Sequence, residues 1–215
     1  MNLKPILIVI GIVVVAGFLI FLNNGCTTMA GVNNMINNEE NQNQKVLVAY
    51  FSRTGEQYSV GNITEGNTAI IAKMIANKTK GDLFEIKVKD DLYPKSYTEL
   101  TEYAKVEKQR NARPEIAGNV NDFGSYGTIF IGYPNWWGDM PMPVYTFIEN
   151  YDFTGKNVIP FCTHEGSGLS GTQNNIQKSV KGKVLNGLAI YGHVSQNDRT
   201  KADKLVSEWL KGLGF

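Results

Sequence analysis

From residue 45 to the end of the chain, short runs rich in β-branched and aromatic residues alternate with segments that have the 3.6-residue periodicity of helices. The strand-like runs span 45–51, 82–88, 127–134, 156–163 and 183–192. The helix-like segments span 67–81, 97–110, 142–151, 171–180 and 199–214. Because strands alternate with helices, the strands are expected to be parallel and to have helices on both faces. The pattern predicts a doubly wound α/β fold with three layers and a sheet of five strands.

The composition fits one such domain and excludes several kinds of site. The chain has 215 residues, 42% of them apolar, and its 21 basic and 20 acidic residues give a net charge of +1. A charge so close to zero provides no electrostatic footprint for nucleic acid, so nucleic acid is not expected as a partner. The two cysteines and two histidines predict neither a disulfide scaffold nor a thiolate metal cluster, and there is no HExxH motif. No metal site is predicted.

The first 22 residues differ from the rest of the chain. Residues 6–22 read ILIVIGIVVVAGFLIFL without a charge, and a helix over residues 3–22 would be about 30 Å long, which matches the apolar core of a bilayer. A cleaved signal peptide would usually have a shorter apolar region. Lys4 precedes the run and the next basic residue is Lys45, so the positive-inside rule places the remainder outside the cytoplasm. The sequence predicts a single-pass protein of the cell membrane, anchored by a transmembrane helix in residues 1–22, with an extracytoplasmic domain.

Residues 23–44 join this segment to the domain and are rich in asparagine and glutamine. Few of them are apolar, which is typical of a disordered tether. Within the tether, Cys26 follows Gly25 as a lipidated cysteine would, although the two asparagines before that glycine do not fit a lipidation signal. Lipidation at Cys26 therefore stays open as an alternative to the membrane helix. The folded domain is expected over residues 45–215.

Three loops are expected to meet at one edge of the sheet. In a doubly wound sheet, ligands bind beyond the carboxyl ends of the strands. The loops at that edge contain SRTG and GNT after the first strand (52–68), PNWWGDMPM after the third (134–142) and THEGSGLSG after the fourth (163–171). All three are dense in glycine, hydroxyl, amide or aromatic groups. The sequence therefore predicts a ligand site at this edge.

The motifs in these loops resemble those of the flavodoxin family. They are YFSRTG (50–55), GYPNWWGDMPMPV (132–144) and FCTHEGSG (161–168), and the middle one is the most specific. The resemblance covers residues 45–215. It implies a five-stranded parallel sheet of order 2-1-3-4-5 that binds FMN noncovalently.

By this resemblance, the first loop would hold the FMN phosphate. Unpaired N–H groups and the dipole at the start of a helix favour an anion. Flavodoxins have such groups in one continuous run, whereas residues 56–65 separate SRTG from GNT here. The entropy cost of closing the longer loop is only about 1 kcal/mol, so the phosphate site is expected to be retained. The expected residues are Ser52, Arg53, Thr54, Gly55, Asn67 and Thr68. Asn67 or Thr68 is also expected to cap the following helix.

The second loop would face the flavin ring, which is held by stacking and apolar contact. One of its two tryptophans is expected to pack into the core, and the WGD match makes Trp137 the better stacking candidate. In flavodoxins the peptide after this aromatic residue turns over when the flavin is reduced, and Gly138 suits that role because glycine accepts either turn type. The expected residues are Pro134, Asn135, Trp136, Trp137 and Gly138.

The third loop would approach the pyrimidine edge of the flavin. Its expected residues are Thr163, His164, Glu165, Gly166, Ser167 and Gly168. Many flavodoxins have a second aromatic residue here, and its absence implies a flavin face open to a substrate or partner. The glycines at 166, 168 and 171 spell GxGxxG, but the next strand does not end in an acidic residue, so a dinucleotide site is not predicted. Cys162, inside the fourth strand, is expected to be a buried, inert thiol.

The leading hypothesis is an FMN-dependent redox protein that transfers electrons at the membrane surface to a partner protein or a quinone. The cofactor would supply the chemistry, and no catalytic acid–base pair is assigned. One alternative is an NAD(P)H:quinone-type reductase, in which the second reactant reaches the open flavin face near His164. A second alternative is a flavodoxin-fold binding module without flavin.

Overall fold

The computed structural model describes residues 45–91 and 93–215. The predicted membrane anchor over residues 1–22, the tether over 23–44 and Cys26 lie outside these ranges. Among the helices that are described, none is both long and apolar enough to cross a membrane.

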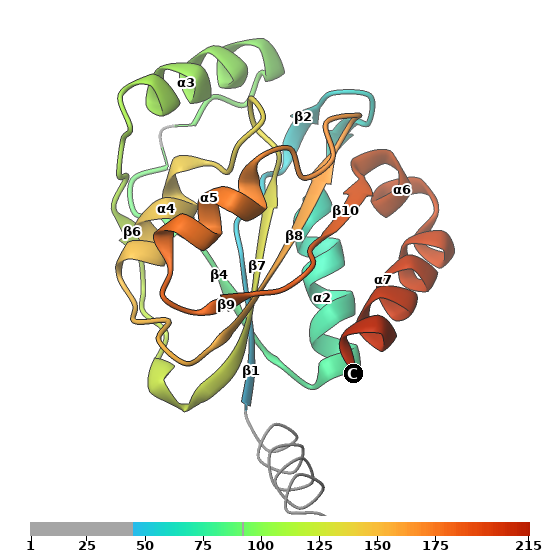
Figure 1. The fold of residues 1–215 in the computed structure, drawn as a ribbon. Coiled ribbons are helices and arrows are strands. Elements are labelled where there is room, and N and C mark those ends of the chain that lie inside the picture. The colour runs from blue at the N-terminus through green and yellow to red at the C-terminus, as the bar shows by residue number, and fades with distance from the viewer. Residues whose placement is uncertain (1–44, 92) are drawn as a thin grey trace, which may run out of the picture. The chain divides into compact units, whose positions relative to one another are not determined.

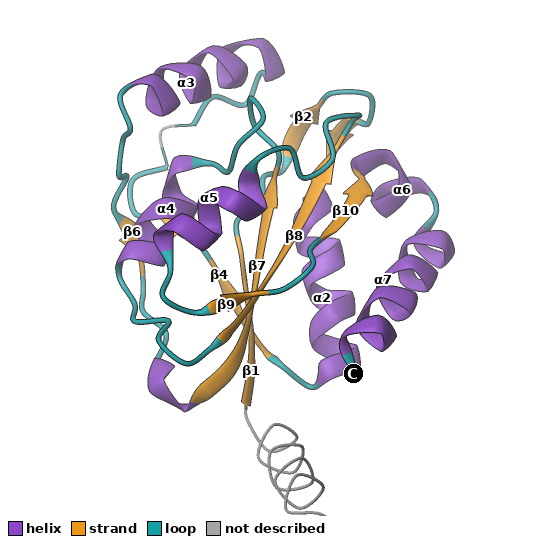
Figure 2. Ribbon diagram, viewed as in Figure 1, coloured by secondary structure: helices purple, strands orange, loops and turns teal. Residues whose placement is uncertain are grey.

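A parallel sheet forms the centre of the domain (Figures 1 and 2). Its strands are β1 (Lys45–Tyr50), β4 (Asp82–Glu85), β7 (Tyr126–Pro134), β8 (Asn157–His164), β9 (Lys183–Val184) and β10 (Leu188–Tyr191). The order is β4-β1-β7-β8-β10, and β9 also pairs with β8; every pairing is parallel. The predicted doubly wound sheet of order 2-1-3-4-5 is confirmed.

The run 183–192, which the sequence predicts as one strand, forms two strands on the same side of β8. Val184 lies opposite Val158 and Leu188 lies opposite Phe161, so the outer chain has one extra residue between the two pairings. The break lies beside Pro160, which has no N–H to donate to a ladder. Gly187 passes so close to Pro160 that a Cβ would lie 2.8 Å from the Pro160 oxygen. The single-strand prediction is therefore wrong because of a proline in the neighbouring strand.

Helices cover both faces of the sheet (Figure 1). One face is covered by α2 (Asn67–Thr79), α6 (Gly192–Asn197) and α7 (Arg199–Leu213), and the other by α4 (Met142–Glu149) and α5 (Thr172–Ser179). The strands supply both cores because successive side chains point to opposite faces: Leu47 packs on the α4 side and Val48 on the α2 side. The predicted three-layer arrangement is confirmed.

Smaller elements surround this framework. Residues 56–65 contribute to an antiparallel hairpin of β2 (Gly55–Gln57) and β3 (Gly61–Ile63), closed by positive φ angles at Ser59 and Gly61. β5 (Lys87–Val88) pairs with β6 (Ile116–Ala117), and a 3₁₀ turn, η1 (Phe123–Ser125), precedes β7. The hairpin, β6 and η1 are not predicted from the sequence. The predicted strand over residues 82–88 is divided into β4 and β5, and β5 lies outside the central sheet.

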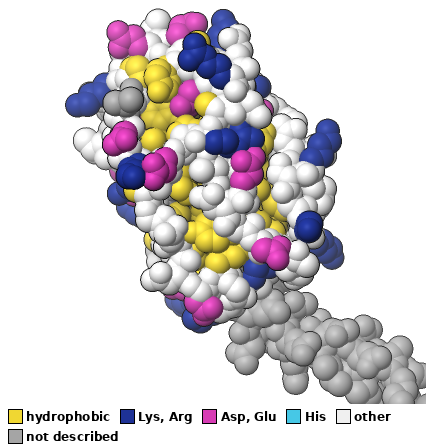
Figure 3. Space-filling view, turned by 90° about the vertical axis from the view of Figure 1, so that its left-hand side faces the viewer, with side chains coloured by type: hydrophobic (Ala, Val, Ile, Leu, Met, Phe, Trp, Pro, Cys, Tyr) yellow, Lys and Arg dark blue, Asp and Glu magenta, His cyan; other side chains and the backbone are white. Residues whose placement is uncertain are grey.

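The remaining helix, α3 (Tyr97–Gln109), packs on the domain through a narrow stripe, with Leu100 and Ala104 as its buried residues. On the side of the molecule that carries α3 and α4, hydrophobic side chains reach the surface between acidic and basic ones (Figure 3). Large exposed hydrophobic residues include Tyr58, Tyr103, Val106 and Trp137. The side of α3 that faces the sheet edge contributes to the cavity described next.

Candidate functional site

A cavity of about 390 Å³ opens at the carboxyl edge of the sheet. Its size falls within the range of about 300–1,000 Å³ that is usual for small-molecule sites. All three predicted loops contribute to it. The predicted residues that line it are Asn67, Pro134, Asn135, Trp136, Trp137, Thr163, His164, Glu165 and Ser167.

A second wall of the cavity comes from residues that were not identified from the sequence. They are Gln57 and Tyr58 of the hairpin, Tyr97, Leu100, Thr101 and Ala104 of α3, and Gly192 of α6. The hairpin is attached to α3: Glu56 Oε2 accepts a hydrogen bond from Tyr97 N at 2.8 Å, and the Tyr58 and Tyr97 rings stack with centroids 5.7 Å apart. The insertion therefore forms a wall of the cavity. The sequence signal for it is an aromatic residue inside an insertion beside a predicted ligand loop.

The two fragments of the split loop meet at the start of α2. Gly66 is the N-cap residue, so the prediction that Asn67 or Thr68 caps the helix is wrong. Ser52 supplies the acceptor instead, because its Oγ accepts a hydrogen bond from Ala69 N at 3.1 Å. Gly66 makes room for this contact, since a Cβ there would collide with Ser52 Oγ and Arg53 O.

Two polar side chains on the first turn of α2 have different surroundings. Thr68 Oγ1 and Thr163 Oγ1 are 2.8 Å apart and buried, so they hydrogen-bond the first loop to the third. Asn67 Oδ1 is buried without a hydrogen-bond partner among the described residues. Such an atom is costly unless something binds it. Asn67 itself lines the cavity, so the side chain that carries this unpaired acceptor lies beside the space for a ligand.

The Arg53 side chain points away from this cavity. Its Nη1 donates to Asp91 at 2.5–2.6 Å and its Nη2 to the Tyr93 carbonyl at 3.2 Å, and the guanidinium lies 5.1 Å from the Tyr93 ring centroid. These contacts give Arg53 a structural role. The other predicted residues outside the cavity lining are Ser52, Thr54, Gly55, Thr68, Gly138, Gly166 and Gly168.

The two tryptophans flank a tight turn. Trp136 and Asp139 exchange both backbone hydrogen bonds, at 2.9 and 3.0 Å. The central residues Trp137 and Gly138 have φ angles of +55° and +73°, as in a type I′ turn. Trp136 makes edge contacts with Phe51 and packs against the core, whereas Trp137 is 49% exposed. Trp137 is therefore the more exposed of the two tryptophans that line the cavity.

Residues 45–211 match the sequence profile of the flavodoxin family. The chain belongs to the flavodoxin family. Two similar crystal structures are proteins assigned as flavoproteins. The one from Bacteroides eggerthii DSM 20697 is 28% identical, with a TM-score of 0.63 and coverage of 80% of this chain and 99% of that one. The one from Bacteroides uniformis ATCC 8492 is 30% identical, with a TM-score of 0.60 and coverage of 78% and 98%.

A third structure of the same fold is a flavoprotein from Lactobacillus acidophilus NCFM in complex with FMN. It is 23% identical, with a TM-score of 0.55, and the match covers 73% of this chain and 97% of that one. Among curated proteins, none matches this flavodoxin-family chain significantly.

The third loop of this family member is held by α6. Glu165 accepts hydrogen bonds from His193 N at 2.8 Å and pairs with His193 Nδ1 at 2.7 Å. The His164 ring lies 4.4 Å from the Tyr191 ring, measured between centroids. Burial lowers the pKa of His164 below its ordinary value of 6.5; Glu165 opposes the shift and His193 adds to it. A lowered pKa favours the neutral imidazole at pH 7.

The thiol of Cys162 fixes the end of this loop. Its Sγ donates to the Gly168 carbonyl at 3.2 Å, and burial raises the pKa of the thiol to about 12. Since the thiolate is the reactive form, the prediction of a buried, inert thiol agrees with this environment. Within residues 45–91 and 93–215, no group of three or more His, Cys, Asp or Glu side chains could hold a metal ion.

Proposed function

We propose that this chain binds FMN in the cavity and works as a redox protein. The observation that carries the proposal is that residues of all three predicted loops line one cavity at the carboxyl edge of the sheet: Asn67 of the first loop, residues 134–137 of the second, and residues 163–165 and 167 of the third. Membership in the flavodoxin family and the FMN complex of the Lactobacillus acidophilus flavoprotein both support FMN as the cofactor. FMN when bound supplies the electron-transfer chemistry, and the protein supplies binding, orientation and electrostatics.

The residues at the start of α2 fit the phosphate and the ribityl chain of FMN. The helix begins at Asn67, and a helix start favours an anion. Gly66 keeps the two halves of the split loop close together, because a Cβ would fill the space between them. Asn67 lines the cavity, and its side-chain amide is of the kind that hydrogen-bonds a ribityl hydroxyl. These groups would hold the polar end of FMN, and Trp137 with the third loop would hold the ring.

An electron carrier is the first form of this proposal, with a protein or quinone as redox partner. An NAD(P)H:quinone-type reductase is the second. It is favoured by exposed aromatic surfaces on the cavity lining, Tyr58 at 58% and Trp137 at 49%, against which a planar reactant can stack. Stopped-flow oxidation of NAD(P)H with a quinone distinguishes the two, because rapid turnover without a protein partner contradicts the pure carrier.

Flavin binding is tested by titrating the purified chain with FMN and with riboflavin. We expect saturable binding of one FMN per chain, accompanied by a shifted visible spectrum. Riboflavin lacks the phosphate and is expected to bind more weakly, because it cannot use the start of α2. A chain that binds neither compound would be a flavodoxin-fold binding module without flavin, and the proposed function would then be wrong.

From the sequence, we also propose that residues 1–22 anchor the domain to the cell membrane, with residues 45–215 extracytoplasmic. The support is the charge-free run over residues 6–22 and the position of Lys4 before it. Protease added to intact cells is expected to remove the domain. Digestion only after lysis would contradict the orientation, and recovery of the chain without detergent would contradict the anchor.

A further inference from the structure

The turn that contains Trp137 adopts a conformation that its surroundings must maintain. The φ of Trp137 is +55°, a left-handed value that is unfavourable for a residue with a Cβ. Such residues persist where neighbouring groups hold them, and they cluster at functional sites. The groups that hold this turn are therefore candidates for a functional role.

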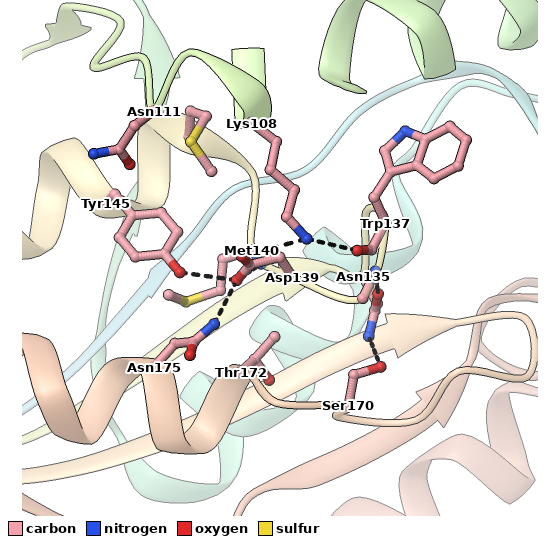
Figure 4. Close-up of polar contacts among 12 residues, drawn as sticks. Lys108, Asn111, Asn135, Trp137, Asp139, Met140, Tyr145, Ser170, Thr172 and Asn175 are labelled. Carbon is pink, nitrogen blue, oxygen red and sulfur yellow. Dashed lines mark hydrogen bonds and ion pairs between the residues drawn. The ribbon is translucent and has the colours of Figure 1, made fainter. Parts of the chain in front are cut away.

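The peptide between Trp137 and Gly138 is hydrogen-bonded on both sides (Figure 4). Lys108 Nζ donates to the Trp137 carbonyl at 2.7 Å, and the Gly138 N–H donates to Asn135 Oδ1 at 3.0 Å. Turning this peptide over would convert the type I′ turn into a type II′ turn, in which φ stays positive at Trp137 and becomes negative at Gly138. Both hydrogen bonds would then break. The two side chains therefore select one of two orientations.

The Lys108 side chain is held in place by the buried carboxylate of Asp139. Its Nζ lies 3.6 Å from Asp139 Oδ2, and Asp139 is 9% exposed. Asp139 Oδ1 accepts from the Tyr145 hydroxyl at 2.8 Å and from Asn175 Nδ2 at 3.0 Å (Figure 4). Since α4 and α5 fix Asp139, the ammonium from α3 is held between that carboxylate and the turn.

We propose that Lys108 is a positioning residue that fixes the orientation of the Trp137–Gly138 peptide and thereby sets the relative affinity of the site for oxidised and reduced FMN. Asn135 and Trp137 line the cavity, so the peptide that follows Trp137 lies beside it. Lys108 keeps the carbonyl directed toward α3. Without that bond, the hydrogen bond from Gly138 N–H to Asn135 alone opposes a turn of the carbonyl toward a hydrogen-bond donor in the cavity. The reduced flavin ring has more N–H donors than the oxidised ring, so loss of Lys108 favours the reduced form.

This inference rests on the proposed binding of FMN, and its first test is the midpoint potential of FMN bound to the full-length chain. The potential relative to free FMN reports the ratio of the two affinities. In Lys108→Met we expect the ratio to change about tenfold toward reduced FMN, since a hydrogen bond from a charged donor contributes at least that much. A tenfold change is about 30 mV for a two-electron couple.

Lys105→Met is the matched control. Lys105 is on the same helix and its Nζ lies 5.3 Å from the centroid of the Trp137 ring, but it does not bond the peptide. Both variants lose a positive charge, which disfavours the more negative reduced flavin, but only Lys108→Met also releases the Trp137 carbonyl. Lys105→Met is therefore expected to lower the potential, and Lys108→Met is expected to raise it. Lys108→Arg, which keeps charge and N–H donors, is expected to restore most of the wild-type value. Shifts of the same sign and size in Lys105→Met and Lys108→Met would overturn the proposal.

Amide hydrogen exchange of Gly138 tests the positioning without FMN. Lys108→Met is expected to speed this exchange about tenfold, because the bond to Asn135 is then made only part of the time, and Lys105→Met is expected to leave it unchanged. Unchanged Gly138 exchange in Lys108→Met would refute the role of Lys108 even if the wild-type chain does not bind FMN. If Lys108→Met does not fold, Lys108→Gln, which lacks the charge and reach of the ammonium, takes its place.

Discussion

The hydrogen bond between Thr68 and Thr163 is a sharp test of how the first and third loops are held together. The two residues are 1% and 3% exposed, and their hydroxyl oxygens are 2.8 Å apart. Valine has nearly the same shape as threonine without the hydroxyl. Thr68→Val therefore leaves the Thr163 hydroxyl buried without this partner, which is expected to lower the free energy of unfolding by about 1–3 kcal/mol. Thr163→Val is expected to cost a similar amount.

The double variant separates this bond from other effects of the substitutions. The double variant removes both hydroxyls, so neither is left buried without a partner. Its loss in free energy of unfolding is therefore expected to be at least about 1 kcal/mol smaller than the sum of the losses in the two single variants. Urea unfolding of residues 45–215, followed by tryptophan fluorescence, measures all three. Thr98→Val, at an exposed position in α3, is the control and is expected to change stability by less than about 0.5 kcal/mol. Single costs that add in the double variant would refute the coupling of the two loops.

Three other predictions concern residues around the cavity. Gly66→Ala is expected to weaken FMN binding and destabilise the domain by about 1–3 kcal/mol, because its Cβ collides with Ser52 and Arg53; Gly171→Ala, at a cap with open space, should leave FMN affinity unchanged. For His164, an NMR titration is expected to give a pKa below 6.5. As the pH falls, His164 therefore takes up its proton in the unfolded state before it does so in the folded state. The free energy of unfolding is expected to be highest above about pH 6.5 and to fall as the pH drops toward the pKa of His164 in the folded state. His164→Gln is expected to make the stability less dependent on pH in this range. Because burial raises the pKa of Cys162 to about 12, a thiol reagent at neutral pH should label it only after denaturation; rapid labelling of the native domain would contradict its burial.

The strand order could be predicted because it depends on local patterns. Charge-free or alternating runs mark buried and edge strands, and the helices between them require parallel connections. The division of the last strand could not be predicted in this way, because it depends on Pro160 in the neighbouring strand. The hairpin could not be predicted either, because it depends on contacts of Glu56 and Tyr58 with Tyr97, which lies 41 and 39 residues further along the chain.

The location of the site could also be predicted, since topology brings the ends of parallel strands to one edge. The direction of individual side chains could not. Arg53 has the right position for a phosphate loop, but Asp91 and Tyr93 draw its guanidinium away. The cap of α2 illustrates the same limit: Gly66 leaves space that Ser52 fills from the preceding loop, so the acceptor comes from outside the local sequence.

The most direct test of FMN binding in this cavity is an NMR titration of the isotope-labelled domain with FMN, read at each backbone amide. We expect shifts that saturate at one FMN per chain and concentrate at residues 66–69, 135–138 and 163–168, with smaller shifts in the hairpin and the start of α3. An absence of shifts would contradict FMN binding. The domain has another hollow, whose lining includes Tyr103, Glu107 and Arg113. Shifts that gather there instead would show that FMN binds elsewhere on the domain.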